Sequence, residues 1–182
     1  MTDGPPEVER RKRGLLDTSA VIDLDRLVAD DLPLELAVSA ITMAELAAGP
    51  HATSDPQERA GRIERLQAAE ATFDHLPLDA FAARAYGRIY AAVLASGRKA
   101  RGRRALDLLI AATALANELP LYTCNPDDFE GLTELVEVVA VKPALIGAEA
   151  SSQQSASDPG VLASHGAESD ESTAPDAQAP DS

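Results

Sequence analysis

Aromatic residues are scarce in this chain of 182 residues: they make up 3% of it, and tryptophan is absent. Apolar residues still reach 45%, so any core must be built from leucine, valine, isoleucine and alanine. The single cysteine, Cys124, excludes an internal disulfide and suits a reducing, cytoplasmic compartment. The sequence contains no run of eighteen apolar residues, so we expect no membrane span. Asp17 and Asp23 interrupt the apolar run behind Arg13, which argues against a signal peptide.

Positive charge is also in short supply, and the formal net charge is -14. Taken over the whole chain, this charge argues against a nucleic-acid partner, because phosphates repel an acidic surface. Half of it, however, lies in residues 148–182, which contain seven acidic residues, no lysine or arginine and few large apolar residues. Such a composition predicts a disordered acidic tail. We therefore expect one domain over residues 13–147, preceded by a disordered basic arm over residues 1–12.

Short apolar runs alternate with helical patterns between the arm and the tail. Strands are predicted to end at Leu16 and to cover residues 33–39, 75–78, 119–123 and 136–141. Helices are predicted to begin near Ser19 and Thr42 and to cover residues 56–73, 80–96 and 105–117. This alternation predicts an α/β fold: a single domain with a parallel central sheet of four to five short strands, flanked by helices.

An acidic residue follows a strand or opens a helix at four places: Asp17, Glu45, Asp107 and Asp128. Parallel strands place their carboxyl ends on one edge of the sheet, where ligands bind, so these acids can converge. Local roles also account for them. Asp17 can cap a helix, Thr42 and Glu45 form the pattern of a capping box, and Asn125 can cap the turn that carries Asp128.

Asp107 has the weakest local explanation of the four. It lies in the first turn of a helix that is apolar nearly all round, where the helix dipole favours an anion and Arg103 or Arg104 can pair with it. A carboxylate on a buried helix is nevertheless unfavourable by several kcal/mol unless it is paired or bound to a metal. A cluster of carboxylates needs a cation, and oxygen ligands without histidine or cysteine suit Mg²⁺ or Mn²⁺. Such ions can activate water for phosphodiester cleavage.

The order and spacing of these motifs resemble the PIN-domain ribonucleases, specifically the VapC-type toxins of toxin–antitoxin pairs. The matching stretches are residues 16–20, 45–46, 106–112 and 123–129, and the resemblance covers about residues 13–142. It implies a Mg²⁺-dependent endoribonuclease that forms a homodimer and is inhibited by a cognate VapB-like antitoxin. It also implies that Asp17 and Asp107 are the central metal ligands and that Glu45 assists. By the same resemblance Asp128 completes the site directly or through water. Some family members carry Asp where this chain has Asn125, so either Asn125 or Asp128 can fill the fourth position.

One basic segment stands out in this acidic chain. Residues 98–104 carry five positive charges just before Asp107, and we expect Arg98, Lys99 and Arg101 to contact RNA phosphates. A solvated loop or an antitoxin-binding surface is the alternative.

Three other functions share part of this pattern. A receiver domain needs an acidic pair after the first strand and a phosphorylatable Asp after a middle strand, and the chain offers neither at the required spacing. A haloacid-dehalogenase-like phosphatase needs an Asp where Ser19 stands. A non-catalytic PIN-like interaction module remains as the alternative to the nuclease.

Overall fold

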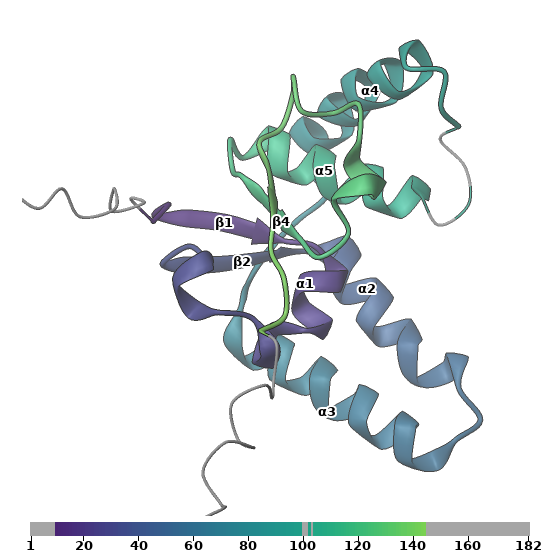
Figure 1. Cartoon of the computed structure of the whole chain (residues 1–182). Coiled ribbons are helices and arrows are strands. Elements are labelled where there is room, and N and C mark those ends of the chain that lie inside the picture. Colours follow the sequence, from purple (N-terminus) through teal and green to yellow (C-terminus); the bar gives the residue numbers. More distant parts are fainter. Residues whose placement is uncertain (1–9, 100–101, 103, 145–182) are drawn as a thin grey trace, which may run out of the picture. The chain divides into compact units, whose positions relative to one another are not determined.

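The structure, a computed structural model, describes residues 10–99, 102 and 104–144 (Figure 1). The predicted acidic tail and residues 1–9 of the predicted arm lie outside the described residues. Five strands form one sheet, and every pair of neighbouring strands is parallel. They are β1 (Arg13–Leu16), β2 (Glu35–Ser39), β3 (Asp74–Leu76), β4 (Leu121–Thr123) and β5 (Val138–Ala140), in the order β3-β2-β1-β4-β5. The predicted parallel sheet is confirmed.

Five α-helices connect these strands. They are α1 (Thr18–Ile22), α2 (Ala40–Ala48), α3 (Pro56–Thr72), α4 (Ala80–Ala95) and α5 (Arg104–Ala116). Four short 3-10 turns complete the described chain: η1 (Leu24–Arg26), η2 (Ala29–Asp31), η3 (Gly49–Ala52) and η4 (Pro126–Phe129). Figure 1 shows α4 and α5 on one side of the sheet and α1 and α3 on the other. No described helix has both the length and the apolar content needed to cross a membrane.

The sheet is buried on both faces. Leu15 and Leu16 are neighbours in β1, point to opposite faces and are both fully buried. Leu15 belongs to the core formed with α4 and α5, and Leu16 belongs to the core formed with α1 and α3. This explains why the strands read as continuous apolar runs rather than alternating ones.

Close packing fixes the contact between β1 and β4. A Cβ atom on Gly14 would lie 2.4 Å from Cε2 of Tyr122 and 2.9 Å from Cγ of Pro33. The Tyr122 ring therefore occupies the space that a side chain at position 14 would need. Because β4 pairs with β1 in this register, the carboxyl end of β4 lies beside the residue that comes directly after β1.

The last three residues of the predicted arm are attached to the domain. The backbone N–H groups of Leu34 and Glu35 donate to the carbonyls of Arg11 and Lys12, at 3.0 and 2.9 Å. The side chain of Arg10 donates to the carbonyls of Leu32 and Ala29. These bonds extend the pairing of β1 with β2 toward the N-terminus, so residues 10–12 continue the central strand's path.

Candidate active site

Asp17 directly follows β1, the central strand of the sheet. The neighbouring strands β2 and β4 continue the chain on opposite sides of β1, so Asp17 lies at the point where the strand order reverses. Its side chain caps α1: Oδ1 accepts a hydrogen bond of 2.8 Å from the backbone N–H of Ala20. Asp17 is only 5% exposed, so this cap is a buried carboxylate rather than a surface one.

Two hydroxyl groups contact the same carboxylate. Ser19 Oγ lies 2.8 Å from Oδ1 of Asp17, and Thr123 Oγ1 donates to Oδ2 at 2.9 Å. Each hydroxyl accepts in turn from the backbone: Ser19 Oγ from the N–H of Cys124, and Thr123 Oγ1 from the N–H of Asn125. These backbone bonds fix the hydroxyls so that their protons point at Asp17. The sequence placed Ser19 in this turn, but Thr123 was identified only as the end of a strand.

The electrostatic environment of Asp17 is unfavourable for its charge. Burial raises the pKa of this carboxyl above its ordinary value of 3.8, and the negative charge of Asp128 raises it further. The hydrogen bonds from Ala20, Ser19 and Thr123 lower the pKa but do not cancel the effect of burial. Asp128 is thus close enough to repel Asp17. A cation between these carboxylates would relieve both the burial and the repulsion.

Glu45 has a different role from the one that its local sequence suggests. The predicted capping box of Thr42 and Glu45 is wrong, because α2 begins two residues earlier and Ser39 is its cap. Ser39 Oγ accepts from the backbone N–H of Thr42 at 3.0 Å. The carboxylate of Glu45 instead accepts a hydrogen bond of 2.5 Å from Thr18 Oγ1. Glu45 therefore contacts Thr18, the residue directly after Asp17, and this contact is not a helix-capping hydrogen bond.

The other two acids lie on elements that meet near this edge. Asp107 is half-buried in the first turn of α5, which contacts both α2 and η4. Its neighbour Leu106 lines a small apolar pocket of about 330 Å³ together with Glu45. Asp128 is half-buried in η4. The predicted cap at Asn125 is wrong in one respect: Asn125 stands at the capping position, but its side chain makes no capping hydrogen bond.

The donor set at this edge fits a hard divalent cation. Within residues 10–99, 102 and 104–144, no three Asp, Glu, His or Cys side chains form a ready-made group around one ion. Magnesium does not need such a group, because it keeps several waters and binds through one or two carboxylates together with substrate phosphates. Burial raises the pKa of the Cys124 thiol, which keeps it protonated and leaves carboxylate oxygens as the donors.

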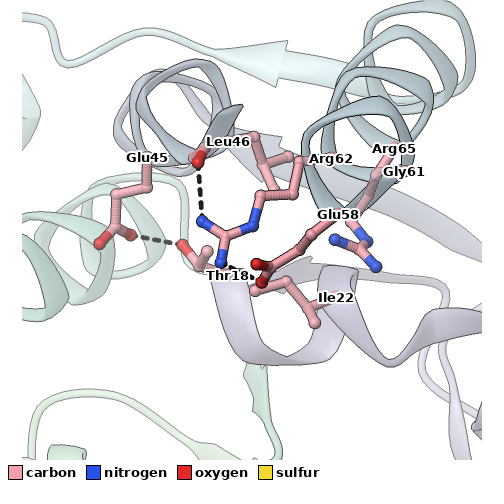
Figure 2. A pocket seen from close by; sticks show the side chains of 9 residues that line it. Thr18, Ile22, Glu45, Leu46, Glu58, Gly61, Arg62 and Arg65 are labelled. Atoms are coloured by element: carbon pink, nitrogen blue, oxygen red, sulfur yellow. Dashed lines mark hydrogen bonds and ion pairs between the residues drawn. The ribbon is translucent and has the colours of Figure 1, made fainter. Parts of the chain in front are cut away.

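An open cleft of about 610 Å³ adjoins one of these acids, Glu45 (Figure 2). Thr18 and Glu45 line one part of it, and Glu58, Arg62 and Arg65 of α3 line another. Sequence reasoning missed these arginines, because on α3 alone they appear as the ordinary charged face of an amphipathic helix. Only the packing of α3 against α2 brings them to the cleft that Glu45 lines.

The three residues predicted to bind RNA differ in what the structure shows of them. Arg98 forms an ion pair with Glu130 and donates to the carbonyl of Asp127 at 3.2 Å. It therefore connects the end of α4 to η4, the turn that carries Asp128. Lys99 is exposed. Arg101 lies outside the part of the chain that the structure describes.

A five-stranded parallel sheet with a buried acid after its central strand, and further acids on the elements around it, defines an α/β domain of nuclease type. Residues 14–135 match the PIN domain family, and the chain belongs to this family.

Its relatives include Ribonuclease VapC5 of Mycobacterium tuberculosis, which is 34% identical over 132 residues. That match covers 71% of this chain and 94% of the relative.

Two solved structures extend the comparison. VapBC-5 from Mycobacterium tuberculosis, a member of the VapBC family of toxin–antitoxin systems, has a TM-score of 0.63 and 36% identity. The match covers 71% of this chain and 99% of that one. VapBC-1 from nontypeable Haemophilus influenzae has a TM-score of 0.54 and 25% identity, covering 69% and 96%. The resemblance inferred from the motifs is confirmed.

Proposed function

We propose that this chain is a metal-dependent endoribonuclease and the toxin of a toxin–antitoxin pair. The observation that carries the proposal is the buried Asp17 carboxylate, held by Ser19 and Thr123 while its pKa is raised by burial and by Asp128. A cap needs no burial and no second acid beside it. A site that binds a divalent cation needs both a fixed carboxylate and an excess of negative charge.

Mg²⁺ or Mn²⁺ is the cofactor that this donor set favours. Asp17 and Asp107 would hold it, Glu45 would assist, and Asp128 would complete the site directly or through water. When bound, the ion supplies an activated water and neutralises charge on the phosphodiester that is cut. Thr18 holds Glu45, while Ser19 and Thr123 hold both oxygens of Asp17, so the protein fixes its carboxylates before substrate arrives.

The substrate, partner and location follow from the family resemblance. RNA is the substrate, a VapB-like antitoxin is the inhibitor, and the active form is a cytoplasmic homodimer. Exposed Lys99, with Arg98 and Arg101, would attract RNA to the N-terminal end of α5. Light scattering of the purified chain tests the dimer, and a monomeric mass at micromolar concentration would contradict it.

RNA cleavage is the decisive test of the activity. The wild type should cut RNA with Mg²⁺ or Mn²⁺ and stop when EDTA is added. Asp17→Asn should abolish the cut, because it keeps the shape of the side chain and removes its charge. The control is Asp79→Asn, since Asp79 also caps a helix through its side chain but is exposed and lines none of the site.

The same variants test the role as a toxin. Expression of the wild type should arrest bacterial growth, and expression of Asp17→Asn should not. A chain that binds RNA but cuts nothing with either metal would instead support the non-catalytic interaction module.

A further inference from the structure

We propose that Arg65, beside Arg62 on α3, binds a phosphate of the RNA next to the one that is cut. The inference rests on the proposed function and extends it to a residue that neither the motifs nor the acids identify. It begins from the cleft in Figure 2, where the side chains of Glu58, Arg62 and Arg65 extend from α3 toward α1.

The spacing of three charged residues on α3 and a glycine on the same wall determine the form of this cleft. Positions 58, 62 and 65 are separated by four and three residues, so their side chains share one face of the helix. Gly61, on the same wall, has open space where a side chain would begin, with no atom within 4 Å of an added Cβ. The cleft is therefore lined by long charged side chains around a position that leaves it open.

Arg62 is committed to the protein itself. It donates to the carbonyl of Gly49 at 2.7 Å and to Glu58 at 2.6 Å. The hydrogen bond from Thr53, and then Arg62, hold the pKa of Glu58 below its usual range, so Glu58 stays ionised and compensates Arg62. This network fixes the end of α2 to α3 and shapes the wall on which Arg65 stands.

Arg65 differs from its neighbours in having no such commitment. Arg59 donates to the carbonyls of Pro50 and Thr53, as Arg62 does to Gly49. Among the residues that the structure describes, the Arg65 guanidinium has neither a hydrogen bond nor an ion pair, although the residue is half-buried. A guanidinium presents donors in a planar fork that matches phosphate, and one left unpaired in a cleft is available to a ligand.

The position of the cleft favours an RNA phosphate as that ligand. Glu45 belongs to the proposed site and also lines the cleft, so the two are continuous. A single strand that is cut at the acids must continue past them on both sides of the scissile bond. The next phosphates then need a path with positive charge, and the cleft of α3 supplies it beside an otherwise acidic edge.

RNA binding at several salt concentrations tests the proposal. A short fluorescent single-stranded RNA is titrated in Mg²⁺ with proteins that all carry Asp17→Asn, which prevents cleavage. Adding Arg65→Ala should weaken binding on the order of tenfold, as loss of a charge-assisted hydrogen bond implies. It should also lower the slope of log K against log salt by about 0.7, the value for one phosphate contact. Arg65→Lys should keep the slope and lose part of the affinity.

Arg88→Ala is the matched control, because Arg88 is an exposed arginine of α4 outside the cleft. It removes the same charge and should change affinity less than twofold, with no change of slope. Equal effects of Arg65→Ala and Arg88→Ala would overturn the proposal. So would an unchanged RNA affinity with weakened binding of an oligo-glutamate peptide, which would make the cleft a carboxylate site.

Failure of this inference can be told from failure of the proposed function. If the wild type cuts RNA with metal while Arg65→Ala binds RNA like the control, only the role of Arg65 is wrong. If the wild type neither binds nor cuts RNA, the proposed function is wrong and the role of Arg65 falls with it. Melting curves confirm that each variant is folded before it is scored.

Discussion

Replacing Asp17 with Asn should separate the role of a metal ligand from that of a helix cap. Asn caps as well as Asp does, so the N–H of Ala20 keeps its acceptor. What the change removes is a buried negative charge that lies beside Asp128. Without metal, the variant should therefore melt at the same temperature as the wild type or higher. An ordinary cap lost entirely, as in Asp79→Ala, should instead cost about 1 kcal/mol.

The raised pKa of Asp17 also determines the direction in which the stability of the protein changes with pH. Burial, with a smaller contribution from Asp128, raises the pKa of Asp17, so the folded protein keeps a proton that the unfolded chain has released. The free energy of unfolding of the metal-free wild type should therefore fall as pH rises from 3.8 through the raised pKa, and this contribution then levels off. Asp17→Asn lacks this loss, so its stability relative to the wild type should grow across the same window.

The binding of metal sets the size of the expected change in melting temperature. An ion that binds only the folded state at a hundredfold excess over its Kd stabilises it by about 2.7 kcal/mol. At roughly 2–4 °C per kcal/mol for a chain of this size, the wild type should melt about 5–10 °C higher with Mn²⁺ or Mg²⁺. Asp17→Asn should lose most of that increase, and Asp79→Asn should retain it.

The assay is a set of melting curves with EDTA and with metal, recorded across pH for the wild type and these variants. The reasoning is refuted if Asp17→Asn melts lower than the wild type without metal and still gains the full increment with metal. That pattern would mean that the charge of Asp17 stabilises the fold and that Asp17 holds no metal.

Two further outcomes follow from other contacts, and a third follows from the composition of the tail. Thr123→Val should lower the free energy of unfolding by about 1–3 kcal/mol in urea titrations, because Asp17 loses a buried donor. Arg98→Ala should raise the metal concentration that gives half-maximal cleavage, since it frees the turn that carries Asp128, whereas exposed Lys99→Ala should not. Deleting residues 148–182 should leave the melting temperature and cleavage unchanged, and a large drop in melting temperature would contradict the predicted domain boundary.

The fold was predictable because its signals are local. Apolar runs of strand length and the helical patterns that separate them are readable within a few residues. The edge of the sheet that carries Asp17 was predictable because parallel strands share one edge, and a single metal site formed by the four acids stays a prediction. The individual roles of these acids were not predictable, since the same residue types serve as caps and as ligands.

Glu45 shows where local reasoning fails. The pattern of Thr42 and Glu45 favours a capping box, but Ser39 is a cap of equal quality three residues before Thr42 and starts the helix earlier. The partner of Glu45 is Thr18, 27 positions away in sequence. Local reasoning also gives no role to Arg65, because the cleft that it shares with Glu45 depends on how α3 packs. Contacts of this range are set by tertiary packing, which no short window of sequence contains.

The order of strands in the sheet has a consequence for protein synthesis. Asp17 is made near the start of the chain, but its donor Thr123 and its acidic neighbour Asp128 are made more than a hundred residues later. An unfinished chain that ends before β4 therefore has neither the fixed carboxylate nor the second acid, whatever its first strands have formed. A ribosome that has not yet made β4 and η4 therefore carries no assembled form of the proposed site, which can arise only once these elements have left the exit tunnel.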